Sequence, residues 1–275
     1  IIWYTDSAGS GYGTDRARLF ATISAFNSTV LLKYSSIADN IQPWYSEGGS
    51  AYISHCSLHT ENTGDLVNVK RAVAPVVEYC ELRGNRAPDT DAIDYDGVVG
   101  GSIRHNHIHS FFAENSDGID LGENARNVIV EHNIIHDCSD KAISIGQAST
   151  ALIRRNVIFH CAMGVAVKDS FSIAIVEQNT LHENGVAVAC YEKNTSRGGG
   201  RAEVRNTILT SSIDATVTSD KLSTLSVRYS LSNLERIPGE GNLHDDPRYV
   251  HPGMGNLALR PDSPCIDRGI SWYVP

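Results

Sequence analysis

Short segments of alternating apolar and polar character recur along the chain. Clear examples are AIDY (92–95), GIDL (118–121), AISI (142–145), GVAV (164–167) and GVAV (185–188). Successive side chains of a β-strand point to opposite faces, so the second residue of each segment should face a core and the third should face outward. The expected inward-facing row is Ile93, Ile119, Ile143, Val165 and Val186.

A second pattern marks a bend that recurs once per unit. A small polar residue or Asn is followed two positions later by an aliphatic residue, and the central residues are Ser35, Cys56, Cys80, Asn106, Asn133, Asn156, Asn179, Asn206 and Ser230. Their intervals of 21 to 27 residues suit one coil of a parallel β-solenoid, and no helical periodicity accompanies them. Asn tolerates the left-handed conformation of a tight bend, and stacked Asn side chains can hydrogen-bond one another. We therefore interpret this column as structural.

These bends, together with the tail DPRYVHPGMGNLALRPDSPCIDRGI (246–270), resemble the right-handed parallel β-helix (pectate-lyase-like) superfamily. A tail of the form DP…L…SPCID is common among its secreted bacterial members. The resemblance implies an all-β fold, a right-handed parallel β-helix built as a single-stranded solenoid of about nine coils. We expect one domain, with an N-terminal cap over 1–24, coils over 25–235 and an irregular C-terminal segment over 236–275. The superfamily includes lyases, hydrolases, epimerases, binding modules and adhesins, so this fold alone does not fix a function.

Composition narrows the possible partners. The 275 residues carry a net charge of −9 and a pI near 5.6, which argues against nucleic acid as a partner. No segment approaches the roughly 18 apolar residues of a membrane span. The chain opens with IIWYTDSAGSG, without a signal-like region, and we interpret it as processed or trimmed. A secreted or cell-surface location in a bacterium therefore rests on the resemblance, and the oligomeric state stays open.

The outward-facing row of the same short strands is the candidate functional surface. It runs Asp94, Asp120, Ser144, Ala166 and Ala187. These mostly small side chains predict a flat floor along which an extended polymer could lie. Carboxylates gather at one end of this floor, and calcium, a hard cation that binds six to eight oxygens, would relieve their repulsion. The predicted calcium ligands are Asp94, Asp96, Asp120 and Glu123.

The resemblance to acidic-polysaccharide lyases of the superfamily implies a division of roles. In such enzymes calcium bridges substrate carboxylates to aspartates, and a basic residue removes the proton next to the carboxylate. Lys168 or Lys141 would be the base, which requires a lowered pKa, and Tyr191 or a nearby histidine would be the acid. The residues expected to bind the substrate are Asp94, Ser144, Lys193 and Arg197.

Two other functional interpretations stay open beside the lyase. NSDG (115–118) resembles a polygalacturonase motif, with Asp117 and Asp140 at two of its three acidic positions, but Lys141 replaces the third. The alternative from a different class is a non-catalytic carbohydrate-binding or adhesive module of a larger secreted protein. In that case Asp117 and Lys141 form an ordinary ion pair between coils. We favour a calcium-assisted lyase on a uronate-containing polysaccharide, with the module as alternative and the hydrolase ranked below both.

Stacked cysteines and histidines occupy further columns. Cys56 and Cys80 share one column, and Cys138 and Cys161 share another, at a spacing that permits either disulfides or buried thiols. We favour buried thiols. A row of ionisable residues follows the bend, with His59, Arg83, His109, His136 and His182 in line and His160 displaced. Stacked imidazoles can share a metal ion, but we interpret the row as semi-exposed polar residues of a turn.

Overall fold

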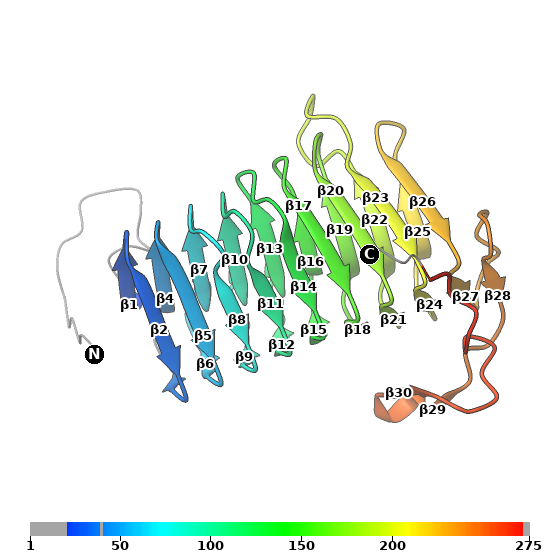
Figure 1. Ribbon diagram of the computed structural model, residues 1–275, viewed down its shortest axis with the longest axis horizontal. Helices are drawn as coiled ribbons and strands as arrows, with labels where there is room; N and C mark the ends of the chain where they lie inside the picture. Colours follow the sequence, from blue (N-terminus) through cyan, green and yellow to red (C-terminus); the bar gives the residue numbers. More distant parts are fainter. Residues whose placement is uncertain (1–20, 39–40, 272–275) are drawn as a thin grey trace.

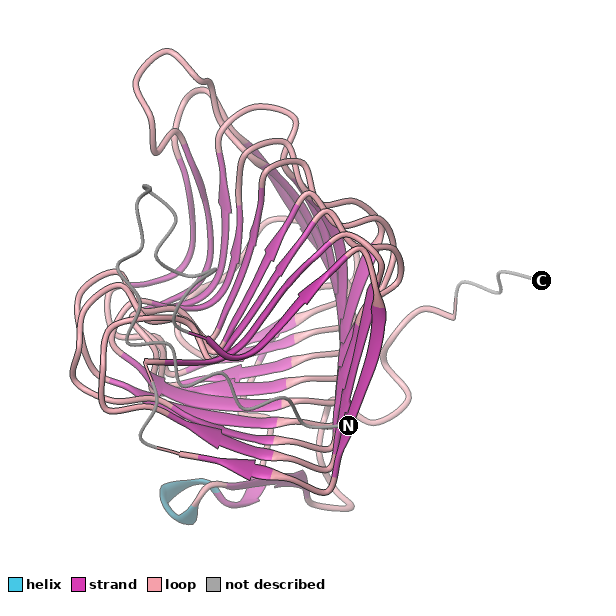
Figure 2. Cartoon of the chain, turned by 90° about the vertical axis from the view of Figure 1, so that its left-hand side faces the viewer, coloured by secondary structure: helices cyan, strands magenta, loops and turns pink. Residues whose placement is uncertain are grey.

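The computed structural model describes residues 21–38 and 41–271 and shows a solenoid in which each coil contributes three short strands. Strands from successive coils stack in parallel and form three long sheets (Figures 1 and 2). Among the described residues, two of these sheets have nine strands and the third has ten. The predicted all-β, parallel β-helix of about nine coils is confirmed.

The three sheets, called A, B and C, follow one another around each coil. Sheet A contains β1 (Ala21–Phe26), β4 (Gln42–Glu47), β7 (Val67–Lys70), β10 (Ile93–Asp96), β13 (Ile119–Gly122), β16 (Lys141–Ile145), β19 (Met163–Lys168), β22 (Val186–Tyr191) and β25 (Ala215–Ser219). Sheet B contains β2 (Thr29–Lys33), β5 (Ser50–Ser54), β8 (Val76–Glu78), β11 (Ser102–Arg104), β14 (Val128–Glu131), β17 (Thr150–Arg154), β20 (Ile173–Glu177), β23 (Arg201–Arg205) and β26 (Thr224–Arg228). Sheet C contains β3 (Ser36–Ile37), β6 (Ser57–His59), β9 (Glu81–Arg83), β12 (His107–Phe111), β15 (Ile134–Cys138), β18 (Val157–Phe159), β21 (Thr180–His182), β24 (Ile208–Thr210), β27 (Leu231–Ser232) and β28 (Leu243–His244).

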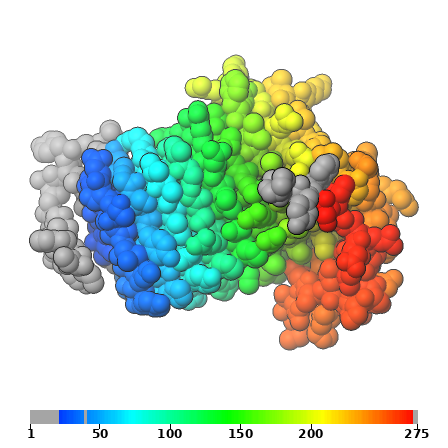
Figure 3. All heavy atoms as spheres, in the orientation of Figure 1, coloured from blue at the N-terminus to red at the C-terminus, as the bar shows by residue number. Residues whose placement is uncertain are grey.

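The C-terminal segment leaves the solenoid and folds back against its last coils. It contains the antiparallel pair β29 (Tyr249–His251) and β30 (Asn256–Leu259) and the short 3-10 turn η1 (Pro252–Met254). Figure 3 shows these orange and red residues beside the yellow end of the stack. Asn206 fastens the tail there, because its amide donates to the Ile270 carbonyl at 2.9 Å and accepts from the Ile270 N–H at 2.9 Å.

The observed limits of the coils differ from the predicted ones. Sheet A already begins at Ala21, inside the segment 1–24 that was expected to be a cap, and residues 1–20 lie outside the described range. Sheet C continues to His244, beyond the predicted limit of 235.

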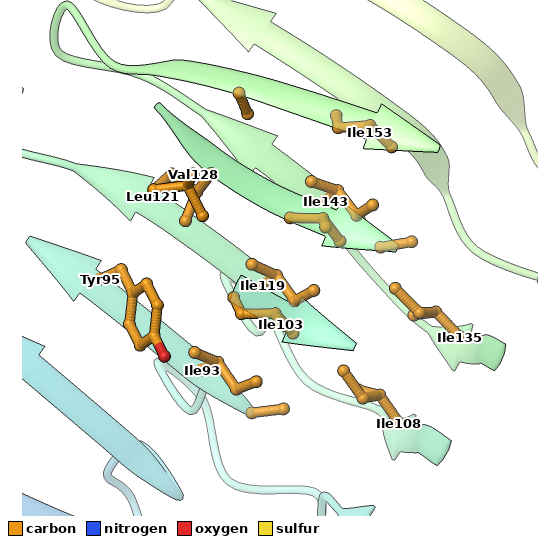
Figure 4. Packing of buried hydrophobic residues seen from close by; sticks show 14 of the residues in the cluster. Ile93, Tyr95, Ile103, Ile108, Ile119, Leu121, Val128, Ile135, Ile143 and Ile153 are labelled. Carbon is orange, nitrogen blue, oxygen red and sulfur yellow. The ribbon is translucent and has the colours of Figure 1, made fainter. Parts of the chain in front are cut away.

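The core consists of inward-facing side chains stacked coil upon coil. Ile93 pairs in register with Ile119, and Ile119 with Ile143, and all three are fully buried. Figure 4 shows this row beside the Ile108 and Ile135 pair of sheet C. Like residues stack on like because adjacent parallel strands lie only ~4.8 Å apart, so every column demands a similar shape on each coil.

The predicted Asn column exists as a continuous hydrogen-bonded ladder. The amide of Asn106 donates to Asn133, that of Asn133 to Asn156, and that of Asn156 to Asn179, each at 3.0 Å. The expectation for Asn206 was wrong, because Thr207 stands in the ladder instead and accepts from the Asn179 N–H. The ladder satisfies polar groups that the bend would otherwise bury without partners.

The residue with left-handed backbone is the one before each ladder residue, not the ladder Asn itself. Positive φ angles near 50° recur at Tyr34, His55, Tyr79, His105, His132, Arg155, Gln178, Asn206 and Tyr229. The first five of these carry rings that stack on one another at centroid distances of 4.8 to 5.0 Å. The bend therefore uses ring stacking to offset the cost of a conformation that Asn was expected to supply.

One strand of sheet A has a different register from the predicted one. Val188, rather than Val186, lies beside Val165 in the core, and Ala189, rather than Ala187, lies beside Ala166 on the outward face. All six cysteines lie in the described residues and are free thiols, five of them buried, as favoured from the sequence.

Candidate functional site

The candidate site is the outward face of sheet A, called here the floor, and it has two columns. The first column contains Asn68, Asp94, Asp120, Ser144, Ala166 and Ala189. The second contains Lys70, Asp96, Gly122, Gly146, Lys168 and Tyr191. Strand alternation places both columns on the same face, two residues apart along each strand.

Lys168 and Asp120 meet on this floor although two coils separate them. The Lys168 side chain lies over Gly146, where an added Cβ would come within 3.1 Å of its Cε. Its Nζ reaches to 3.7 Å from Oδ1 of Asp120, whose side chain is 31% exposed. The absence of a side chain at Gly146 is what permits this reach, and it brings a buried amine to a half-exposed carboxylate.

The small residues of the first column are covered rather than open. Ser144, Ala166 and Ala189 have no exposed surface. Ser144 donates to Asp120 at 2.5 Å, and the stem of Lys168 lies over Gly146 on the same strand face. The flat, open floor expected from small side chains is therefore partly filled by long side chains of the second column, and the accessible groups are those at its margins.

The four predicted calcium ligands do not converge. Asp96 accepts from Lys70 at 2.6 Å, Asp94 accepts from Asn68 at 2.7 Å, and Asp120 faces Ser144 and Lys168. Glu123 is exposed beyond the end of β13. Among the described residues, no three of these carboxylates have oxygens within 4.8 Å of one another. A calcium ion needs several converging oxygens, which these four carboxylates do not present in this arrangement. Calcium binding is not tested by it and stays a prediction.

Lys141 sits at the end of the floor between two carboxylates. Its Nζ donates to Asp117 at 3.1 Å and to Asp140, and only 3% of the residue is exposed. Burial lowers its pKa, but the charge of Asp117 and the contact with Asp140 outweigh burial and hold the pKa above its usual range. Lys141 therefore stays protonated, which suits an electrostatic role and not that of a base.

Asp117 belongs to a ladder of aspartates that resembles the Asn ladder. The Asp91 N–H donates to Asp65 at 3.0 Å, the Asp117 N–H to Asp91 at 2.6 Å, and the Lys141 N–H to Asp117 at 2.9 Å. Burial raises the pKa of Asp65 and of Asp117 to about 6. Burial and the neighbouring carboxylates, Asp65 first, raise the pKa of Asp91 well above its usual value.

This ladder makes the protein less stable as the pH rises. A carboxyl with a raised pKa in the folded chain is still protonated at a pH where the unfolded chain has ionised, so folding is favoured at low pH. For Asp65 and Asp117 the loss falls between about pH 4 and pH 6.

Replacing Asp91 by Asn should therefore raise the free energy of unfolding at pH 8, by on the order of 1 kcal/mol, because one pKa unit corresponds to about 1.4 kcal/mol. The amide oxygen still accepts the Asp117 N–H, while the charge is gone. Urea unfolding at pH 8 and pH 4.5 checks this, and the gain should shrink at pH 4.5. An equal loss of stability at both pH values would contradict the assignment.

Tyr191 and the segment after it form the other margin of the floor. Burial raises the pKa of Tyr191 to about 12, and Lys141, Asp140 and Asp117 are among the charges that act on its hydroxyl. The phenol therefore keeps its proton at neutral pH. Tyr191 lies in register beside Lys168 on the neighbouring coil.

The segment 192–200 rises above the neighbouring turns (Figure 1). Asp169 anchors it by accepting from the N–H groups of Lys193 and Asn194 at 2.8 and 2.9 Å. A hollow of about 970 Å³ lies beneath it, lined in part by Asp169, Phe171 and Arg197. Lys193 and Arg197 are both exposed, as binding of a soluble polymer requires.

Sequence reasoning missed two residues of the site, Lys70 and Asp65. The segment DLVNVK (65–70) precedes DAIDYD (91–96) by one coil and supplies both. The two segments share a sequence pattern, with Asp first and a charged residue last, and this similarity could have identified both residues.

The three stacked parallel sheets and the ladder of bend residues define a parallel β-helix protein. A family model described as a right-handed β-helix region matches residues 27–209, and the chain belongs to that family. A search of curated proteins found no match. Among solved structures, an alginate lyase from Paenibacillus sp. str. FPU-7 matches at 12% identity with a TM-score of 0.47, covering 81% of this chain and 98% of that one. In the described part of the chain, no helix has the length and apolar character needed to cross a membrane.

Proposed function

We propose that this protein is a polysaccharide lyase that cleaves a uronate-containing polymer by β-elimination. The observation that carries the proposal is the presence on one floor of a buried lysine, Lys168, facing a partly exposed carboxylate, Asp120, with a protonated phenol, Tyr191, in register beside Lys168. The substrate class implies a secreted or cell-surface protein, which is part of the proposal.

The elimination needs one group to take a proton and another to supply one. Lys168 acts as the base and takes the proton from the carbon next to the substrate carboxylate. The electrons of that C–H bond form the new C=C bond, and the glycosidic C–O bond breaks. Tyr191 gives its proton to the departing oxygen, and its pKa of about 12 keeps that proton available. Asp120, which accepts a hydrogen bond from the Ser144 hydroxyl, holds the amine of Lys168 in place.

The margins of the floor supply contacts for the polymer. Arg197 and Lys193 offer positive charge to its carboxylates. Phe171 is 81% exposed at the hollow beneath them and offers an apolar face to a sugar ring. Asp94, at the opposite margin, is placed to accept hydrogen bonds from sugar hydroxyls. No step of this mechanism uses calcium.

A non-catalytic binding or adhesive module is the second candidate. The observation that favours it is the burial of Lys168, which is only 5% exposed and already faces Asp120. Hydrolysis ranks lower, because the two carboxyls it would use, Asp117 and Asp140, both contact Lys141.

Incubation with a panel of uronate polymers separates the candidates. A lyase gives a product with a C=C bond, which absorbs in the ultraviolet, and we expect that absorbance to grow on at least one polymer. Retained binding without any new absorbance or reducing ends would identify a module. New reducing ends without the absorbance would identify a hydrolase.

Replacing Gly146 by Ala should lower the elimination rate by roughly tenfold or more, because a displaced catalytic group costs rate steeply. The new Cβ would stand 3.1 Å from Cε of Lys168 and push the amine away from its position. Initial rates at saturating polymer check this. Gly253→Ala, where an added Cβ meets nothing within 4 Å, is the control and should change nothing. Equal rates for the two variants would contradict the position assigned to Lys168.

A further inference from the structure

A cluster of imidazoles and a carboxylate lies on the outward face of sheet C. Glu81 on β9 pairs in register with His107 on β12, and His109 lies two residues further along the same strand and so on the same face. One ligand atom from each of the three side chains lies within 4.8 Å of the other two. No other group of three His, Cys, Asp or Glu side chains in the described ranges meets that condition.

His109 presents a nitrogen without a hydrogen-bond partner. Its Nδ1 lies 2.9 Å from the Ser110 hydroxyl, and its Nε2 is buried, makes no hydrogen bond and lies 3.5 Å from Oε1 of Glu81. When the Ser110 oxygen accepts the Nδ1 proton, the Nε2 lone pair points toward Glu81. An unsatisfied buried nitrogen of this kind calls for an explanation, and a bound ion supplies one.

His136 on β15 extends the cluster to a third coil. Its Nδ1 donates to Asp137 at 2.7 Å, which leaves the lone pair on Nε2, and that atom lies 2.8 Å from Nε2 of His107. A carboxylate behind an imidazole is the usual support of a metal-binding histidine. Two nitrogens on one tetrahedral zinc ion lie about 3.3 Å apart, given Zn–N bonds of about 2.0–2.1 Å. A shift of about half an ångström of the exposed His107 ring achieves that spacing for the His107–His136 pair, and the His136 ring must also approach Glu81 and His109.

We propose that Glu81, His107 and His109 bind a divalent transition-metal ion of the zinc type, and that His136, which lies outside this 4.8 Å group, turns toward the ion as the fourth ligand. Imidazole nitrogen with one carboxylate is a donor set that suits zinc and its neighbours, whereas calcium and magnesium prefer oxygen alone. The ion would tie together β9, β12 and β15, which are three successive strands of sheet C. This site lies on a different sheet from the proposed lyase site and does not depend on it.

The protonation of the cluster is compatible with metal binding. Burial lowers the pKa of His107, and the neighbouring His109 lowers it further. Burial and the charge of His136 likewise lower the pKa of His109. Both shifts favour the neutral imidazole, which is the form that binds a metal ion. Arg83, the register neighbour of His109, adds positive charge, and Glu81 offsets it.

Calorimetric titration of Zn²⁺ into the tag-free, chelator-treated chain tests the proposal. We expect one equivalent to bind at pH 7.5, and binding should weaken at least tenfold in His107→Ala, His109→Ala and Glu81→Gln. His251→Ala, a histidine at the exposed end of β29, should bind like the native chain. The melting temperature should rise on the order of 5 °C at a Zn²⁺ concentration ~100 times Kd.

Co²⁺ in place of Zn²⁺ reports the ligand geometry through its visible absorption. An intense tetrahedral spectrum that His136→Ala weakens would support the four-ligand site. His107 is exposed, so metal-free His107→Ala should melt like the metal-free native chain, which separates a lost site from a lost fold. The proposal is overturned if the native chain binds no Zn²⁺ at millimolar concentration, or if His107→Ala and His251→Ala bind it equally.

Discussion

Replacing Lys168 by Gln is expected to slow β-elimination on uronate polymers about 10³-fold, with polymer binding changed only a few-fold. General base catalysis contributes on the order of 10² to 10⁴ in rate, and glutamine has no basic nitrogen. The Gln side chain is one atom shorter than Lys and can still lie over Gly146. The measurement is the initial rate of ultraviolet absorbance, together with binding of the polymer by the same variant.

Two further variants make this prediction specific. Lys168→Arg keeps a positive charge beside Asp120 but cannot give up a proton, so it should be as inactive as Lys168→Gln. Lys33→Gln removes an exposed lysine of β2 and should behave like the native chain. An arginine variant with near-native rate would mean that Lys168 acts through its charge, and the base would then have to be sought elsewhere.

Replacing Asn133 by Ala is expected to lower the free energy of unfolding by about 3 to 5 kcal/mol. The Asn133 side chain is 1% exposed, donates to the Ile103 carbonyl and to Asn156, and accepts from the Asn106 N–H and amide. Its loss leaves several buried polar groups without partners, and each costs about 1 to 3 kcal/mol when water cannot reach it. Urea unfolding followed by circular dichroism measures the effect.

The control for the ladder is Asn62→Ala, an exposed asparagine outside it. It should change stability by less than about 0.5 kcal/mol. If Asn133→Ala behaved like this control, water would have to replace the ladder bonds, and the ladder would not be a main source of stability.

The repeat made the fold predictable, because each coil restates the same constraint. The interval between ladder residues identified Asn106, Asn133, Asn156 and Asn179 correctly, and their hydrogen bonds followed from burial. The interval did not show which residue of each bend has the left-handed conformation and which residue joins the ladder. Asn206 matches the sequence pattern of a ladder residue, yet it has the left-handed backbone conformation, and Thr207 occupies the ladder position.

The register of β22 shows that aligning identical sequence motifs can give the wrong strand register. GVAV occurs at 164–167 and again at 185–188, and matching the two spellings pairs Val165 with Val186. The observed partner is Val188, which follows Val165 by 23 residues, the same interval that separates Asn156 from Asn179. Hydrogen bonds between coils fix the number of residues per coil, and this number decided the register. The interval between the ladder residues Asn156 and Asn179 already indicated it.

The candidate site was less predictable from the sequence, because the direction of a long side chain depends on the space that its neighbours leave. The sequence pattern predicted that Lys168 and Asp120 lie on the same outward face of the sheet, and the structure places them there. It could not show that Lys168 crosses Gly146 to reach Asp120, or that Lys141 is held between Asp117 and Asp140. Such contacts depend on which neighbours leave space, and here one glycine leaves it.

Because successive coils are separated by a constant rise, the distances between residues on the floor are fixed. Asp94 on β10 and Tyr191 on β22 stand four strands apart in sheet A, a distance of about 19 Å at ~4.8 Å per strand. A rigid stack cannot close around a short ligand to bring these two ends together. With the polymer bound as proposed, only chains long enough to span that length would contact both Asp94 and Tyr191, and inserting or deleting one whole coil would change that length by about 4.8 Å.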